Sequence, residues 1–153
     1  LQHLPGGVRL LASYNFWQAD DDCYVLRVAA LETTEERLLG TDESVNEGWR
    51  PVFDTVPCRG LTPSKNGENW MPTLGAGGRL AALSESEILL SVGGFGAETL
   101  TEETVAPSAG PRSYGKTVLI NVETGQSRNY SSGHRNPQGL AVAADGSIWL
   151  TDH

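Results

Sequence analysis

The chain has 153 residues, enough for one domain, and its 11 Lys and Arg against 19 Asp and Glu give a net charge of −8. An acidic chain repels phosphate backbones, so this composition argues against a general nucleic-acid-binding protein. No apolar run approaches the ~20 residues of a membrane-spanning helix, and no membrane span is expected. Glycine accounts for 18 residues, an excess that favours a turn-rich, all-β fold.

Short segments of β-forming and apolar residues predict strands along the whole chain. In chain order they are 8–16, 23–30, 49–56, 79–83, 88–92, 116–122, 126–130, 140–143 and 147–151. Pro51 marks the third segment as an edge strand or a strand start. Ala144-Asp145-Gly146 predicts a tight hairpin turn between the last two strands.

Three other stretches are expected to connect these strands. Residues 31–39 read either as a short helix or as a loop with one helical turn, because Thr33-Thr34 interrupts the apolar spacing. The Asp20-Asp21-Asp22 run predicts a solvated turn, with a cation site as the alternative. Residues 98–112 form a long polar connection.

An internal repeat supports a more specific fold. Residues 80–93 align without gaps with residues 140–153 at an offset of 60, with Leu, Ala, Ile and Leu identical at 80/140, 81/141, 88/148 and 90/150. Repeated hairpins at such a spacing are typical of propeller blades, although two ordinary hairpins could resemble each other by chance. We therefore expect an all-β fold, a β-propeller, with approximate blade segments 7–58, 70–122 and 126–153. Because the chain starts without Met and ends directly after a strand, we expect a fragment of two to three blades, truncated at both ends.

The two cysteines are placed to form a disulfide. Cys23 opens one predicted strand, and Cys58 follows the end of another. If the two strands are antiparallel neighbours, the start of one faces the end of the other, and the two sulfurs can come within bonding distance of each other. Two separate buried thiols are the alternative.

The segment Gly133-His134-Arg135-Asn136-Pro137-Gln138-Gly139-Leu140 has the greatest concentration of polar chemistry. Pro137 fixes the backbone, so the loop would present Arg135, Asn136 and Gln138 as a rigid array. An arginine binds carboxylates, and the amides bind ring carbonyls and nitrogens, which suits a planar, anionic ligand. The alternative is a loop whose polar side chains only bind neighbouring backbone.

These eight residues resemble the G-H-R-N-P-Q-G-L motif of the soluble pyrroloquinoline-quinone (PQQ) dependent sugar dehydrogenases, the glucose/sorbosone dehydrogenase family. Gly77-Gly78-Arg79-Leu80 and residues 148–153 are similar to further segments of that family. The resemblance covers residues 70–153, and residues 8–58 more loosely. It implies a six-bladed β-propeller, further blades outside this chain, a sugar as substrate, PQQ and Ca²⁺ as cofactors, and an extracellular or periplasmic location.

The same resemblance implies roles for individual residues. Arg135 would pair with a PQQ carboxylate or quinone oxygen, and Asn136 and Gln138 would hydrogen-bond the cofactor. The family binds Ca²⁺ partly through backbone carbonyls just after the position of His153, so no metal ligand is expected within this chain.

The chain departs from the family at the catalytic base. The window 73–79, where the family has its His, reads T-L-G-A-G-G-R, and Gly94 occupies the position of the Asp that orients this His. We therefore keep as an alternative a catalytically impaired propeller that serves as a ligand-binding or interaction module. His153 is a weak candidate for a replacement base, whereas His134 belongs to the motif itself. A third alternative is an NHL-type propeller, whose repeats also resemble residues 140–152.

The four tryptophans are expected to pack within and between blades rather than to form a sugar platform. They are Trp17, Trp49, Trp70 and Trp149, of which Trp70 is the best candidate for a site role.

Overall fold

The computed structural model of the chain describes residues 1–40, 47–60, 62–63, 69–70, 75–95 and 112–153. The strands are β1 (Gln2–Leu4), β2 (Gly7–Gln18), β3 (Cys23–Thr33), β4 (Arg50–Asp54), β5 (Arg59–Gly60), β6 (Thr62–Pro63), β7 (Asn69–Trp70), β8 (Gly77–Ala82), β9 (Glu87–Val92), β10 (Lys116–Asn121), β11 (Ser127–Ser132), β12 (Pro137–Val142) and β13 (Ile148–Asp152). A single helical turn, α1 (Glu35–Leu39), completes the described elements. None of the described helical residues forms a helix that is long and apolar enough to cross a membrane.

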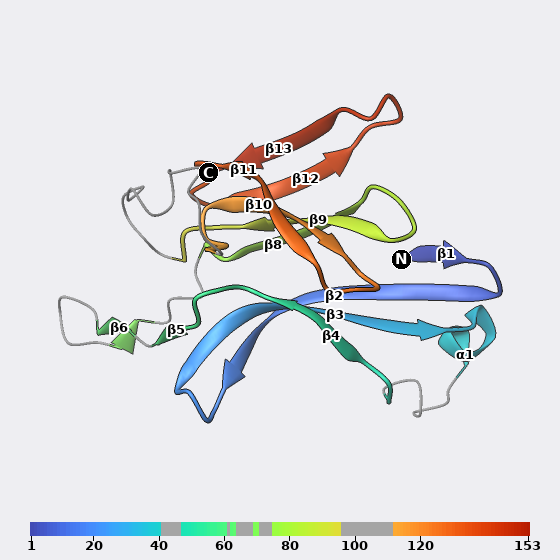
Figure 1. Cartoon of the computed structure of the whole chain (residues 1–153), viewed down its shortest axis with the longest axis horizontal. Coiled ribbons are helices and arrows are strands. Elements are labelled where there is room, and N and C mark those ends of the chain that lie inside the picture. Colours follow the sequence, from blue (N-terminus) through green and yellow to red (C-terminus); the bar gives the residue numbers. More distant parts are fainter. Residues whose placement is uncertain (41–46, 61, 64–68, 71–74, 96–111) are drawn as a thin grey trace.

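Three antiparallel sheets follow one another along the chain (Figure 1). The first has the order β1-β2-β3-β4, with β5 also paired to β3, and the second has the order β11-β10-β9-β8. The third is the β12-β13 hairpin, and β6 and β7 form a small separate pair. Strand β8 lies against both β2 and β12, so the first long strand of each sheet meets its counterpart in the next. This arrangement of consecutive sheets confirms the all-β fold and fits a fragment of a β-propeller.

The second sheet is covered on both faces, as a blade between two other blades must be. In β9 the alternating side chains of Ile88, Leu90 and Val92 join a core with Leu26 and Val28 of the first sheet. Leu89 on the other face of β9 is also fully buried. Since successive side chains of a strand point to opposite faces, the continuous apolar run of β9 is explained by this double burial.

The repeat predicted from the sequence is present in the hydrogen-bonded registers. Leu80 pairs with Leu90 in one hairpin, and Leu140 pairs with Leu150 in the other. Gly77 pairs with Val92, and Pro137 pairs with Asp152, again 60 residues apart. The two hairpins belong to different sheets, so the predicted equivalence of neighbouring blades is confirmed. Ile88 and Leu90 lie in the core as expected, whereas Ile148 and Leu150 are only half-buried.

Several local predictions are also confirmed. The stretch after Thr33 forms one helical turn, whose N-cap Thr34 accepts the Arg37 N–H. The three aspartates from Asp20 form a turn between β2 and β3. Among the described strands β4 pairs with β3 alone, which agrees with an edge position for Pro51. The hairpin between β12 and β13 closes at Asp145-Gly146, where Gly146 has a φ of 83°.

Two expectations need correction. The third blade segment was expected to start at residue 126, but β11 pairs with β10, so the second sheet extends to Ser132 and the third starts at Pro137. The reason is the short Glu123-Thr124-Gly125 turn, which folds β11 directly back on β10. The expected tryptophan packing is also not found within the described residues, where Trp17, Trp49 and Trp149 are 40%, 39% and 68% exposed. The side chain of Trp70 and most of the connection 98–112 lie outside the described residues.

The predicted disulfide is present. Cys23 and Cys58 are bonded, with a Cα–Cα distance of 5.8 Å. Strands β3 and β4 are antiparallel neighbours, and β5, directly after Cys58, pairs with the start of β3. The bond therefore cross-links the start of β3 to the segment between β4 and β5.

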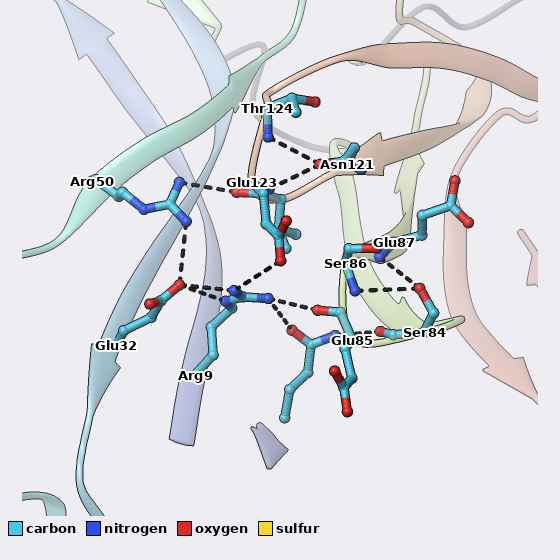
Figure 2. A network of polar contacts seen from close by, with 12 residues as sticks. Arg9, Glu32, Arg50, Ser84, Glu85, Ser86, Glu87, Asn121, Glu123 and Thr124 are labelled. Atoms are coloured by element: carbon cyan, nitrogen blue, oxygen red, sulfur yellow. Dashed lines mark hydrogen bonds and ion pairs between the residues drawn. The ribbon is translucent and has the colours of Figure 1, made fainter. Parts of the chain in front are cut away.

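A buried arginine joins the first and second sheets at the end opposite to the disulfide (Figure 2). Arg9 of β2 is 4% exposed and forms an ion pair with Glu32 of β3 at 2.8 Å. Its Nη1 donates to the backbone oxygen of Glu85 in the β8–β9 turn at 2.6 Å, and its Nη2 lies 3.8 Å from Glu123 in the β10–β11 turn. Arg50 of β4 donates to the backbone oxygen of Val122 at 2.9 Å beside it. We call this network the Arg9 clasp.

Candidate functional site

The segment between β11 and β12 carries the residues that the sequence singled out. Gly133 turns the chain with a φ of 90°, and Pro137 starts β12 and is buried. A left-handed residue is strained for any side chain, so Gly133 is suited to this bend. Since Pro137 restricts Asn136 to an extended conformation, the residues between them have little freedom. We call residues 133–138 the motif loop.

The three predicted ligand-binding side chains are brought together in this loop. Arg135 and Gln138 are exposed, and Asn136 is half-buried. The Gln138 Nε2 donates to the Asn136 Oδ1 at 2.5 Å, so the two amides form one unit on one side of the loop. The three residues therefore share one short loop, and their role in binding a ligand stays a prediction.

Backbone contacts fix the motif loop against the second sheet. The Gly94 N–H donates to the Arg135 oxygen at 2.7 Å, and the His134 N–H donates to the Gly115 oxygen at 3.1 Å. The Ser91 hydroxyl of β9 lies 3.4 Å from the Pro137 oxygen. The loops that start at Gly75 and Gly93 therefore meet the motif loop at one end of the sheets.

The Gly75–Gly94 region is closed by backbone rather than lined with side chains. The Gly93 N–H donates to the Ala76 oxygen at 2.9 Å, and Gly93 and Gly94 are buried. A Cβ on Gly93 would lie 1.8 Å from the Gly75 oxygen and 3.0 Å from the Arg135 oxygen. Main-chain contacts thus fill the described part of the region where the resemblance implies a base and its carboxylate partner.

His153 lies beside this region at the end of β13. Its N–H donates to the Asn136 oxygen at 3.2 Å and to Asp152 Oδ1 at 3.0 Å, and the residue is exposed. This position puts His153 at the same end as the motif loop, where a replacement base would have to be. The catalytic role proposed for it from the sequence stays a prediction.

Two functional candidates were missed by the sequence reasoning. Arg79 of β8 is exposed, and its Nε donates to the Gln138 oxygen at 2.7 Å, which adds a second guanidinium beside the motif loop. The 60-residue repeat contained the signal, because it aligns Arg79 with Gly139, directly after Gln138. Asp152 is the second, since both of its carboxylate oxygens accept N–H groups of the motif loop. A carboxylate that binds backbone has no distinctive signal in the sequence.

His134 is held inside the loop rather than presented to solvent. Its Nε2 lies 2.7 Å from the Ser131 hydroxyl, and its Nδ1 lies 3.7 Å from Asp152 Oδ2. Burial lowers the pKa of His134, Asp152 acts against this shift, and the charge of Lys116 adds to it. Because the imidazole is then neutral at pH 7, it serves as a hydrogen-bonding element of the loop.

Metal ligands are not gathered at this end of the described residues. No group of three or more His, Cys, Asp or Glu side chains in the described part of the chain could hold a metal ion. The Ca²⁺ ligands implied by the resemblance would follow His153.

Comparison with known proteins supports the fold. A solved structure named glucose dehydrogenase superposes with a TM-score of 0.63 at 21% sequence identity, over 95% of this chain and 40% of that chain. The chain shares the fold of that protein. At this identity the likeness concerns the fold alone, and the chain spans well under half of the length of its structural neighbour. No protein-family model matches the chain, and no curated protein matches it.

Proposed function

We propose that this chain forms the ligand-binding end of a sugar-dehydrogenase-like β-propeller that binds PQQ together with Ca²⁺ and a sugar. The observation behind the proposal is the motif loop, which holds Arg135, Asn136 and Gln138 rigidly at the end where the Gly75 and Gly93 loops also meet. The glucose dehydrogenase fold agrees with this proposal.

The donor set suits PQQ, a planar tricarboxylate with two quinone oxygens. Arg135 and Arg79 supply two guanidinium groups, which bind carboxylates through charge-assisted, paired hydrogen bonds. Gln138 and Asn136 supply amide donors and acceptors for ring oxygens and nitrogens. The two cations also balance part of the anionic charge of the ligand, in a chain whose own net charge is −8.

Bound PQQ would supply the redox chemistry: the anomeric C–H and O–H of an aldose give two electrons and two protons to the quinone, so the sugar becomes a lactone and PQQ its quinol. The residues of this chain would bind and orient the cofactor. A base must also take the hydroxyl proton, an effect worth about 10²–10⁴ in rate. Within this chain His153 is the candidate for that task.

A second candidate function is a binding module without redox activity. It is favoured by the closed backbone at Gly75, Gly93 and Gly94, which provides neither a base nor a carboxylate to orient one. Such a propeller would bind an anionic ligand or a sugar without turnover.

An oxidising location and further propeller blades belong to the same proposal. A disulfide between Cys23 and Cys58 persists outside the cytosol, which supports an extracellular or periplasmic protein. The blades that complete the ring would be the main partners of this chain, since its sheets cover less than half of the neighbouring glucose dehydrogenase.

The deciding experiment is a titration of the complete protein with PQQ and Ca²⁺, followed by dye reduction with glucose and other aldoses. Binding with turnover supports the dehydrogenase, binding of PQQ or of the sugar without turnover supports the binding module, and binding of neither contradicts both. Arg135→Ala should weaken PQQ about 10- to 100-fold, because a hydrogen bond between charged groups contributes about 1.5–3 kcal/mol. Arg128→Ala is the matched control, since Arg128 is exposed on β11 outside the motif loop.

A further inference from the structure

The carboxylate of Asp152 is bound to consecutive peptide groups of the motif loop. Its Oδ2 accepts the Arg135 N–H at 3.0 Å, and its Oδ1 accepts the Asn136 N–H at 2.7 Å. Hydrogen bonds to an ionised acceptor are roughly twice as strong as those between neutral groups. Asp152 thus binds the backbone N–H groups of two of the three residues expected to bind the ligand. These two bonds do not use the side chains of Arg135 and Asn136.

The repeat shows that the hairpin does not need this carboxylate for its own folding. In the hairpin of the second sheet the equivalent residue is Val92, which pairs with Gly77 as Asp152 pairs with Pro137. The closing backbone bond is also the same, from Gly93 N–H to the Ala76 oxygen in one hairpin and from His153 N–H to the Asn136 oxygen in the other. An apolar side chain at this position therefore supports the same backbone. The carboxylate instead binds the N–H groups of the motif loop.

We propose that Asp152 is a positioning residue that holds Arg135 and Asn136 in the conformation that binds an anionic ligand. The identity of that ligand rests on the proposed function, whereas the ordering of the loop does not. Asp152 is suited to this task because β13 fixes it opposite Pro137, and because His134, on its other side, is itself held by Ser131. The loop is thereby fixed to the third sheet by Asp152 and to the second sheet by Gly94 and Gly115.

The test exchanges one carboxylate oxygen for an amide nitrogen. In Asp152→Asn the shape is kept, but one of the two loop N–H groups faces an N–H₂ donor instead of an acceptor. The matched control is Asp145→Asn, the same change at the other end of the same hairpin, where Asp145 accepts the Ser147 N–H at 2.9 Å. Asp152→Glu, which keeps the carboxylate, tests for rescue.

Two measurements on the complete protein give the outcome. In hydrogen exchange followed by NMR, the Arg135 and Asn136 amides should exchange at least tenfold faster in Asp152→Asn, unchanged in Asp145→Asn and partly restored in Asp152→Glu, with β9 and β10 amides still protected. In titrations with PQQ and Ca²⁺, Asp152→Asn should bind at least tenfold more weakly than Asp145→Asn. Wild-type exchange rates at Arg135 and Asn136 in Asp152→Asn would overturn the proposal, and so would loss of protection throughout the sheets. Failure of the wild type to bind PQQ would contradict the proposed function alone, because the exchange measurement does not depend on the ligand.

Discussion

At the scale of single residues, the site depends on glycines that let backbones meet. Gly93 packs so closely on Gly75 and Arg135 that even one methyl group has no room. Gly93→Ala should therefore destabilise the protein by about 3 kcal/mol, the upper part of the range for overpacked positions. Urea denaturation measures this loss.

The control for this substitution is Gly60→Ala. The nearest atom to a Cβ on Gly60 is the Asp22 oxygen at 3.9 Å, an ordinary contact, so its free energy of unfolding should change little. Equal effects of the two substitutions would contradict the close approach at Gly93.

Substitution of Tyr24 should raise the stability of the protein, in contrast to Gly93→Ala. Its hydroxyl is buried in the core with Phe95 and Tyr114, and within the described residues it has no hydrogen-bond partner. Burial raises the pKa of Tyr24 far above its usual range, with Arg59 opposing the shift. Since an unpaired buried hydroxyl is unfavourable, Tyr24→Phe should stabilise the protein by about 1 kcal/mol.

Tyr114→Phe is the matched comparison in the same cluster. The Tyr114 hydroxyl donates to the Pro57 oxygen, so its removal leaves that carbonyl without this partner. Thermal unfolding should show a lower midpoint for Tyr114→Phe and a higher one for Tyr24→Phe. A lower midpoint for both would mean that the Tyr24 hydroxyl has a favourable role.

At the scale of elements, the sequence predicted what local patterning controls. The strands, the Asp145-Gly146 turn and the repeat of the two hairpins follow from apolar periodicity and turn chemistry, and the structure has them. The assignment of β11 was wrong because a strand of exposed polar residues carries no pattern that names its partner.

The Arg9 clasp is the element-scale contact with the clearest energetic consequence. Arg9 is buried, and it joins β2 and β3 to two turns of the second sheet. Arg9→Met should lower the free energy of unfolding by about 1.5–3 kcal/mol, because it removes the charged hydrogen bonds to Glu32 and to the Glu85 oxygen. Arg128→Met, an exposed arginine, should be near neutral.

The Arg9 clasp also predicts that the stability of the fold depends on pH. Hydrogen bonds from Arg9 hold the pKa of Glu32 below its usual value of 4.5. A carboxylate with a lowered pKa in the folded state contributes stability above its unfolded pKa, and this contribution is lost as the pH falls through the folded value. Denaturation midpoints below pH 4.5 should therefore fall more steeply for wild type than for Glu32→Gln. Parallel profiles would contradict the contribution of Glu32.

At the scale of the whole molecule, the site could be predicted only in part. The motif loop was identified because eight neighbouring residues carry it, and the side chains of Asn136 and Gln138 do lie together. Arg79 and Asp152 come from other strands and become visible only when the sheets are assembled. The closed backbone around Gly93 is likewise a property of packing, because the sequence shows only that two expected side chains are missing.

The disulfide cross-links the first sheet at the end opposite to the Arg9 clasp. Cys23 and Cys58 are 35 residues apart, and their bond closes a loop that contains β3, α1 and β4. In the chain-entropy account, a loop of this length contributes about 3–4 kcal/mol, because the cross-link restricts the unfolded chain. Reduction, or substitution of both residues by Ala, should lower the free energy of unfolding by this amount. Urea titrations with and without dithiothreitol measure the difference in wild type, and the double variant should be insensitive to the reductant. If the reductant leaves the wild-type midpoint unchanged although thiol titration shows two free cysteines, the bond is not a source of stability.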